Sequence, residues 1–488
     1  MSSFLSSDVA RFLVNFYETA VFYYAVTIMS SYILLAFISL IAVKKYVHKN
    51  TFTNYDSLLT STITPGVSIL APAYNEGVTI VENIRSLLSI HYPNLDLIVV
   101  NDGSKDDTMS KVIEAFSLVK IPFVVNYQIE TKEVLGVYKS TNKAFDNLIV
   151  VDKMNGGKAD ALNVGLNISQ QPYVTCIDAD CILEQDALLK LMKPFEDQTD
   201  TKVIATGGVV RIVNSCRIES GKLLKVVAPK SWVARFQAVE YIRAFLLGRM
   251  AWTFLDGLLI ISGALGIFDR RITIAAGGYN HKTVGEDMEL VVRMRRYMHK
   301  TRQKYQVAFV PDPLCWTEVP EQWDALQKQR NRWTRGTIET LRMHRGVFFN
   351  PKYRKIGLIS YPFWFFFEWM APIIEFLGIV YTIFLAVFGL INWQFFFLMC
   401  ALVYSFAIFF SVFALLLEEV TYHAYGRKRD ISVLLLTAMI EPFVFHPFVV
   451  YAAIRGNIDY IRGKKSWDKL VRKGFAQPPV TQKTNSIA

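Results

Sequence analysis

The chain has 488 residues, a length that suggests two domains. Apolar residues make up 52% of the sequence and charged residues 19%, a balance that is too apolar for a purely soluble enzyme. The formal net charge is +11, but the basic residues cluster beside apolar segments and no nucleic-acid-binding motif is present. We therefore expect a membrane surface as the partner of the basic residues, and no nucleic acid.

The five cysteines are scattered along the chain and none belongs to a Cys-x-x-Cys pair. This pattern predicts neither a disulfide framework nor a zinc site. We expect these cysteines to serve as small buried residues.

Residues 1–48 are predicted to form an N-terminal transmembrane segment. The stretch from Thr19 to Val43 carries no charge and is long enough to cross a bilayer. Lys44 and Lys45 follow directly, which predicts that the C-terminal end of the segment is cytoplasmic and that residues 1–18 lie outside. The polar stretch 49–64 indicates a linker.

Residues 49–321 are predicted to form one cytoplasmic domain, in which strand-like and helix-like patterns alternate from Gly66 onward. A strand that runs into a loop is expected over 67–76, and a second strand, which ends in Asp-Gly, begins at Leu95. Further strands are expected at 122–127, 147–151, 174–177, 203–211 and 265–269, and helices at 81–89, near Asp107, at Lys158 and after Asp287. This alternation predicts an α/β domain with a largely parallel sheet, in which ligands bind at the carboxyl ends of the strands. Asn75, Asp102 and Asp178 all fall at such ends.

A pair of carboxylates, Asp178 and Asp180, follows the apolar strand predicted at 174–177. Two carboxylates in a turn can share Mg²⁺ or Mn²⁺ with the oxygens of a phosphate-bearing substrate. The alternative is a strand-end turn with two solvated aspartates.

Two further motifs have both a chemical and a structural interpretation. In Asn155-Gly-Gly-Lys158 the glycines allow close approach of a ligand and Lys158 can meet a phosphate, although an ordinary turn and helix cap would look the same. In Gly285-Glu-Asp287 the acids either cap a helix or supply a general base, which would be Asp287.

Gln322–Arg345 has the pattern of an amphipathic helix with basic faces, typical of a helix at a membrane interface. It contains Gln329-Arg-Asn-Arg332-Trp333. Together with the aromatic segment at 356–369, interpreted as interfacial or re-entrant, it predicts a region of interface helices over 322–369.

Residues 370–475 are predicted to form a C-terminal transmembrane region, followed by a polar tail over 476–488. Spans are expected at 373–391 and 394–417, and a third apolar run at 431–454 is interrupted by Pro442 and Pro447. If that run crosses the membrane, the basic residues of 455–473 lie outside, against the positive-inside tendency. A re-entrant hairpin at the prolines would keep them inside, and the sequence does not decide between the two.

Six motifs follow one another along the chain: Pro72-Ala-Tyr-Asn-Glu76, Asn101-Asp-Gly-Ser104, Asn155-Gly-Gly-Lys158, Asp178-Ala-Asp180, Gly285-Glu-Asp287 and Gln329-x-x-Arg332-Trp333. Their sequences and their order resemble those of membrane-embedded family 2 glycosyltransferases. That family includes cellulose, hyaluronan, chitin-oligosaccharide and poly-N-acetylglucosamine synthases. The resemblance implies an α/β, GT-A-like nucleotide-sugar-binding domain inserted between N-terminal and C-terminal transmembrane helices. It also implies a multi-pass protein of the cell membrane with a cytoplasmic catalytic domain.

The resemblance also implies roles for individual residues. Asp287 would be the catalytic base, Asp178 and Asp180 would hold Mg²⁺ or Mn²⁺, and Trp333 and Glu286 would contact the acceptor. The residues expected to bind the donor are Ala71, Tyr74, Glu76, Asp102, Lys158, Asp178, Gln329, Arg332 and Trp333.

The activity implied is that of an inverting transferase that extends a β-linked polysaccharide processively from a UDP-sugar, with possible export. The short chain, without an Arg-rich nucleotide-sensing module, favours UDP-N-acetylglucosamine as the donor. Expected partners are the UDP-sugar, a nascent glycan or lipid-linked acceptor, membrane lipid and an accessory or export subunit. The alternatives are a distributive enzyme that adds one sugar to a lipid and a non-catalytic transport or assembly subunit, which the intact Asp180, Asp287 and Arg332 argue against.

Overall fold

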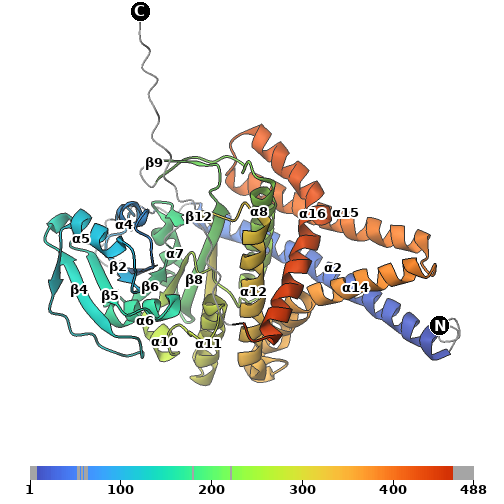
Figure 1. Cartoon of the computed structure of the whole chain (residues 1–488), viewed down its shortest axis with the longest axis horizontal. Helices are drawn as coiled ribbons and strands as arrows, with labels where there is room; N and C mark the ends of the chain where they lie inside the picture. The colour runs from blue at the N-terminus through green and yellow to red at the C-terminus, as the bar shows by residue number, and fades with distance from the viewer. Residues whose placement is uncertain are drawn as a thin grey trace, which may run out of the picture.

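The computed structural model describes residues 8–51, 64–178, 181–219 and 222–464, together with Tyr55 and Leu59. It consists of an α/β domain from which long apolar helices extend to one side (Figure 1). A layer of helices, in which α8 and α12 are prominent, lies between the sheet and the projecting helices (Figure 1).

Within the described residues the domain is built on one ten-stranded sheet with the order β3-β4-β5-β2-β1-β6-β11-β8-β12-β7. The strands are β1 Val67–Ala73, β2 Leu95–Asn101, β3 Leu118–Ile121, β4 Val134–Ser140, β5 Leu148–Lys153, β6 Tyr173–Cys176, β7 Cys181–Leu183, β8 Lys202–Ile212, β11 Gly266–Asp269 and β12 Tyr305–Thr317. A separate hairpin joins β9 Arg217–Glu219 to β10 Lys222–Lys225.

The sheet is mixed, so the expectation of a largely parallel sheet is correct for its centre and wrong for its flanks. Strands β5, β2, β1 and β6 are parallel neighbours, as are β8 and β12. Strand β11 runs antiparallel to both β6 and β8, and β3, β4 and β7 also pair antiparallel. The four central strands carry the continuous apolar runs that a sheet buried on both faces requires.

The strands of the structure differ from the predicted ones in several places. The strand expected at 122–127 is absent because β3 ends at Ile121, before Pro122, which has no N–H to donate to a neighbouring strand. Conversely, β4, β7 and β12 were not predicted, and β12 contains Pro311 and Pro313, residues that are uncommon inside a strand. In the structure β12 passes these prolines with irregular pairing against β8.

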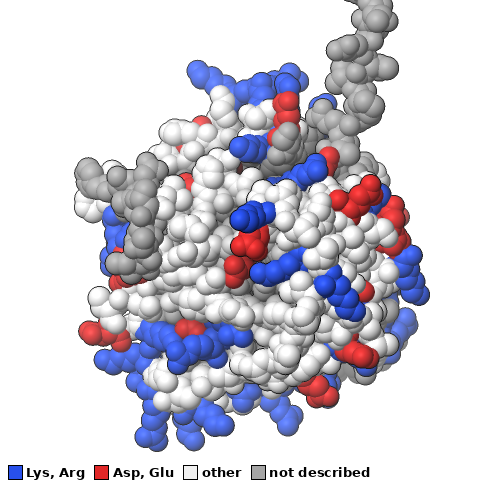
Figure 2. All heavy atoms as spheres, turned by 90° about the vertical axis from the view of Figure 1, so that its left-hand side faces the viewer, with Lys and Arg blue, Asp and Glu red and all other residues white. Residues whose placement is uncertain are grey.

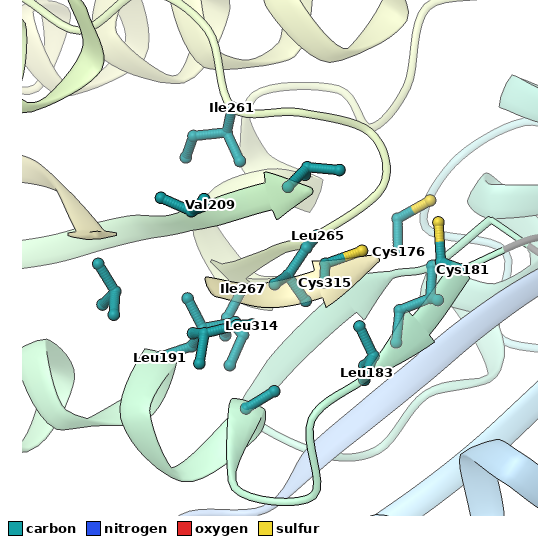
Figure 3. Close-up of a cluster of buried hydrophobic side chains, with 14 of the residues drawn as sticks. Cys176, Cys181, Leu183, Leu191, Val209, Ile261, Leu265, Ile267, Leu314 and Cys315 are labelled. Atoms are coloured by element: carbon teal, nitrogen blue, oxygen red, sulfur yellow. The ribbon is translucent and has the colours of Figure 1, made fainter. Parts of the chain in front are cut away.

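The sheet is covered by helices that follow its strands. They are α4 Ile80–Leu88, α5 Thr108–Phe116, α6 Lys158–Ile168, α7 Ala187–Glu196, α10 Arg270–Ala275 and α11 Glu286–Lys300. Figure 3 shows the apolar packing where β6, β7, β8 and β12 meet, with Cys176, Cys181 and Cys315 among the aliphatic side chains. All five cysteines are free; Cys176, Cys181 and Cys315 are buried as predicted, whereas Cys216 and Cys400 are only partly buried.

The layer next to the projecting helices contains α8 Trp232–Ile242, the π-helical η2 Arg243–Arg249, α9 Met250–Phe254 and α12 Trp323–Met343. The predicted helix at 322–345 is confirmed as α12. Short helical segments, η5 Ile356–Ser360, α13 Tyr361–Phe363 and η6 Trp364–Trp369, then lead into α14.

Four helices in the described part of the chain are long and apolar enough to cross a membrane. The candidate spans are Asn15–Asn50, Ile356–Val387, Trp393–Tyr422 and Lys428–Ile461. They correspond to α2 Asp8–Asn50, α14 Ala371–Val387 with the segments before it, α15 Trp393–Tyr422 and α16 Lys428–Ile461. The re-entrant hairpin allowed at Pro442 and Pro447 is not found, because α16 continues as one helix through both prolines.

An ion pair and a hydrogen bond connect the apolar helices to the α/β domain. Arg211 of β8 forms a buried, bidentate ion pair with Glu418 of α15. The Tyr46 hydroxyl of α2 donates to the Asp312 carboxylate of β12 at 2.5 Å. The opposite end of the domain carries scattered charges of both signs, as expected of a surface in water (Figure 2).

Candidate functional site

A cavity of about 1700 Å³ begins where β1, β2 and β6 end at the same edge of the sheet. Tyr74 and Glu76 follow β1, Asp102 follows β2, and Asp178 lies just beyond β6, and all four line this cavity. Ala71 does not line it, because this residue lies inside β1, paired with Val99, and is buried.

Hydrogen bonds join the loops after β1 and β2. The Asn75 amide donates to the Ser104 hydroxyl at 2.9 Å, and the Lys105 amide donates to the Asn75 side-chain oxygen at 2.8 Å. Asn75 adopts a left-handed backbone (φ 57°), which asparagine tolerates better than most residues. The two motifs at 72–76 and 101–104 therefore form one rim of the cavity.

Asp102 holds the glycine turn at 156–157 in place. Its carboxylate accepts hydrogen bonds from the backbone amides of Gly156 at 2.9 Å and Gly157 at 2.8 Å, and from the Lys153 ammonium at 2.5 Å. Gly157 has φ 89°, a conformation that favours glycine. The turn therefore sets where α6 begins, and with it the position of Lys158.

Lys158 is surrounded by acids. Its Nζ lies 2.5 Å from Asp178 Oδ1 and 3.6 Å from Glu286 Oε1. Burial alone would lower the pKa of Lys158, but Asp178 and Glu286 outweigh burial and raise the pKa above its usual range. Lys158 is thus a permanent cation at the point where the ends of β6 and α11 meet.

The predicted metal pair is only partly within the described residues. Asp178 is half-buried, faces the cavity and offers carboxylate oxygen, the donor that Mg²⁺ and Mn²⁺ prefer, so it fits a cation at this edge. Asp180 lies outside the described residues. No cluster of three metal-ligating side chains is found among the residues that are described.

Asp287 and Glu286 occupy the first turn of α11. The Asp287 carboxylate accepts hydrogen bonds from the amide of Gly263 at 3.2 Å and from the amide of Met288 at 2.8 Å, while its side chain lines the cavity. Burial raises the pKa of Glu286, opposed by Lys158 and reinforced by Asp287. Asp287 is the more accessible of the two acids.

The loop before β11 was missed as part of the site. Ser262, Gly263 and Ala264 line the cavity beside Asp287, whereas the sequence pattern indicated only the strand at 265–269 that follows them. Because residue 263 is glycine, the space beside the Asp287 carboxylate is left open. A Cβ added at Gly263 would occupy that space, 3.7 Å from Asp287 Oδ2. A Ser-Gly-Ala sequence ahead of a strand was the available signal.

Helix α12 brings Gln329, Arg332 and Trp333 to the same cavity. The Trp333 side chain is flanked by the Arg330 guanidinium, 4.2 Å from its ring centroid, and by the Tyr241 ring at 6.5 Å. Glu240 of α8 accepts a bidentate pair of hydrogen bonds from Arg330, one of them at 2.7 Å. Glu240 and Arg330 were not identified from the sequence as parts of the site.

Arg249 is a further cavity-lining residue that sequence reasoning missed. Its guanidinium lies 3.8 Å from the centroid of the Phe245 ring. Burial lowers the pKa of Arg249 to about 10, while the Asp287 carboxylate acts in the opposite direction, so the side chain stays cationic at neutral pH. Its Nη1 is buried without a hydrogen-bond partner among the described residues.

The cavity continues from Asp287 and Trp333 into the apolar helices. There it is lined by aromatic and ionisable side chains: Tyr32 of α2, Glu368 of η6, Glu375 of α14, Phe406 and Phe410 of α15, and Glu441 and His446 of α16. One space thus connects the strand ends of the α/β domain with the membrane-type helices.

The sheet order, the strand-end acids and the neighbouring helix α12 define a GT-A-like glycosyltransferase domain. The family model "Glycosyltransferase like family 2" matches residues 65–336, more than half of the chain, and the model "Chitin synthase" matches residues 278–448. The chain belongs to glycosyltransferase family 2.

Among known proteins the chain is similar to poly-beta-1,6-N-acetyl-D-glucosamine synthases. That of Staphylococcus epidermidis is 26% identical over 276 residues, covering 57% of this chain and 55% of the relative. That of Staphylococcus aureus (strain COL) is 29% identical over 279 residues, with the same shares. The chain thus spans about half the length of the curated relatives it matches.

Among solved structures, a mannosyltransferase from Pyrobaculum calidifontis in complex with GDP-Man and Mn²⁺ aligns with 90% of this chain and 99% of its own. Its TM-score is 0.49 and its sequence identity 17%.

Proposed function

We propose that this glycosyltransferase extends a β-linked polysaccharide from a UDP-sugar, with UDP-N-acetylglucosamine as the donor. The observation that carries the proposal is the single cavity that runs from the strand ends, past Asp287 and Trp333, into the apolar helices. A donor bound at the strand ends and a chain extending toward the membrane would meet at Asp287. The similarity to poly-N-acetylglucosamine synthases supports the choice of sugar.

Asp287 acts in this proposal as the general base. Its carboxylate takes the proton of the acceptor hydroxyl, which then attacks the anomeric carbon as the bond to the diphosphate breaks, inverting the configuration. The amide of Gly263 donates a hydrogen bond that orients the Asp287 carboxylate, and the cationic side chain of Arg249 lines the same cavity.

Lys158 and Arg332 would stabilise the negative charge on the departing diphosphate. Lys158 already has two carboxylates as partners, so the arriving phosphates compete with Asp178 and Glu286 for it. Trp333 would stack on the acceptor sugar, and Glu286 would accept a hydrogen bond from it.

Asp178, with Asp180, would hold a Mg²⁺ or Mn²⁺ ion. Such an ion supplies Lewis-acid stabilisation of the diphosphate. Tyr74, Glu76, Asp102 and Gln329 would surround the nucleotide, with Asp102 acting through the glycine turn that it anchors.

The test measures UDP release and product length in purified membranes, with single UDP-sugars and pairs of them, with and without Mn²⁺. We expect a long polymer from UDP-N-acetylglucosamine alone, and loss of transfer in the presence of a chelator that Mn²⁺ or Mg²⁺ reverses. Transfer of one sugar to a lipid would replace the processive mechanism by a distributive one. A product that forms only when two different UDP-sugars are supplied would contradict a polysaccharide built from UDP-N-acetylglucosamine alone.

The base is tested by Asp287→Asn. The loss of a general base typically slows proton transfer by about 10²–10⁴-fold, while UDP-sugar binding, measured by titration calorimetry, stays unchanged. Asp146→Asn, on the surface near β5, is the control and leaves transfer intact. Transfer by the Asp287 variant at the rate of the unmodified chain would remove Asp287 from this role.

A further inference from the structure

Helix α16 has both of its ends at the catalytic domain. The preceding helix, α15, ends at Tyr422, one turn after Glu418, whose carboxylate is paired with Arg211 of β8. Helix α16 begins shortly afterwards at Lys428. At its other end, Asn331 of α12 donates to the Asp459 carboxylate at 2.9 Å, and Arg335 of α12 donates to the Lys464 carbonyl at 2.7 Å.

The middle of α16 also packs on elements of the domain. Phe445 stacks on Phe236 of α8 with ring centroids 5.5 Å apart, and Phe448 contacts Trp323 of α12 at 4.6 Å. Beyond this point α16 follows α12 lengthwise: Gly456 packs so closely on α12 that a Cβ would lie 2.8 Å from Thr334 Cβ. The second half of α16 is therefore parallel to an amphipathic interface helix.

The other three candidate spans have a different arrangement. Helices α2, α14 and α15 project together from the domain (Figure 1). Far from the domain, Tyr17 of α2 packs on Tyr381 of α14 with ring centroids 4.6 Å apart. In the same view the second half of α16 runs across the direction of these three helices, beside α12.

A helix of 34 residues is about 51 Å long at 1.5 Å per residue, so a crossing helix would have its ends on opposite sides of the bilayer. Both ends of α16 lie on the side of the domain instead: its first residue follows closely on the end of α15 that is paired with β8, and its last turns are bonded to α12. We infer that α16 does not cross the membrane but lies along it on the side of the catalytic domain, with its outer face in the boundary between lipid headgroups and acyl chains.

The surface of α16 has the properties of a helix that lies in the lipid boundary. Its outward face is apolar, with Met439 and Phe443 each more than half exposed (52% and 53%). Exposed basic residues flank this stretch: Lys428 and Arg429 at the start of the helix, and Arg455 and Arg462 toward its end. An apolar face with cationic ends is the pattern of a helix lying in an anionic membrane surface. Arg455, Arg462 and Lys464 then lie on the side of the domain, in agreement with the positive-inside tendency.

The inference is tested by cysteine labelling of the full chain in cells. Three single substitutions, Ser486→Cys in the tail, Val124→Cys on the domain and Asn392→Cys between α14 and α15, are treated with a membrane-impermeant maleimide before and after permeabilisation. The unsubstituted chain gives the background from native cysteines. We expect S486C and V124C to react under the same condition and N392C under the opposite one. Reaction of S486C together with N392C would overturn the inference, whichever side faces the medium.

A second measurement tests whether the outer face of α16 lies at the lipid headgroups. Met439→Cys carries an environment-sensitive fluorophore in the purified full chain, reconstituted in vesicles of phosphatidylcholine and phosphatidylglycerol with a spin label on the headgroup. We expect loss of fluorescence by quenching, whereas the same fluorophore at Val124→Cys stays bright. Bright fluorescence at Met439 would show that something other than the lipid boundary, such as a partner protein, covers this face.

Discussion

Gly285, which precedes the acidic pair of α11, and Gly336, one helical turn beyond Trp333 on α12, meet backbone to backbone. A Cβ added to either glycine would lie 2.8 Å from the Cα of the other. This contact sets the separation between the helix that carries Asp287 and the helix that carries Arg332 and Trp333. Because neither glycine has a side chain, the start of α11 and the middle of α12 can pack in direct backbone contact.

Replacing Gly336 by alanine should therefore disturb both stability and activity. Two backbones must move apart to admit the methyl group, a form of overpacking that costs about 1–3 kcal/mol. We expect a lower unfolding temperature and a larger loss of transfer than of UDP binding, because the two helices carry different parts of the site. Gly346→Ala, where a Cβ meets nothing within 4 Å, is the matched control. Equal, unchanged activity in both variants would contradict the role of this contact.

Trp333→Ala should impair elongation more than hydrolysis of the donor. The indole is 40% exposed and lines the cavity, so its loss removes a stacking surface for a sugar without touching Asp287. The measurement is the ratio of polymer formed to UDP released. Trp393→Ala, at the distal start of α15, should leave that ratio unchanged. Parallel loss of both reactions in W333A would argue against an acceptor role.

Glu240→Gln should raise the KM for the acceptor while leaving the KM for the donor unchanged. The substitution removes the charge that anchors Arg330, the residue stacked on Trp333, and Glu240 is thus a positioning residue. Hydrogen bonds between charged groups contribute about 1.5–3 kcal/mol, so the expected rise is about tenfold or more. Initial rates with varied oligosaccharide and varied UDP-sugar separate the two constants. Glu219→Gln, in the surface hairpin, serves as control, and a rise in the donor KM would refute the assignment.

Glu418→Gln should destabilise the attachment of α15 to the sheet. Arg211 and Glu418 are 1% and 2% exposed, so the variant leaves a buried guanidinium without a counter-charge, at a cost of about 3–5 kcal/mol. The double variant Arg211→Met with Glu418→Leu should recover much of this loss. Thermal unfolding in lipid nanodiscs reports both. Lys49→Ala, which breaks an exposed ion pair with Asp197, should cost less than about 1 kcal/mol.

The sequence predicted the parts of the fold whose patterns are local. The apolar runs of β1, β2 and β6, the amphipathic α12 and the uncharged core of α2 each signal their own structure. The antiparallel flanks of the sheet were not predictable in this way. Whether β4 or β11 runs parallel or antiparallel to its neighbours depends on the path of the chain between strands, which local sequence patterns do not show.

The same distinction holds for the site. Tyr74, Asp102, Lys158, Asp287 and Trp333 belong to recognisable motifs, and the structure brings them to one cavity. Glu240 and Arg249 belong to no motif: they join the site because α8 and η2 pack beside α12 and α11. Such residues become visible only with the tertiary contacts, since nothing in their own sequence neighbourhood distinguishes them from ordinary interface charges.

Helix α2 is continuous from Asp8 to Asn50, 43 residues or about 65 Å, roughly twice the thickness of a bilayer core. Its last turns are bonded to β12 through Tyr46. A helix of this length cannot shorten, so a bilayer of different thickness must change the tilt of α2, and β12 is bonded to the end that tilts. We expect the rate of transfer to depend on the acyl-chain length of the surrounding lipid, measured in vesicles that differ in nothing else.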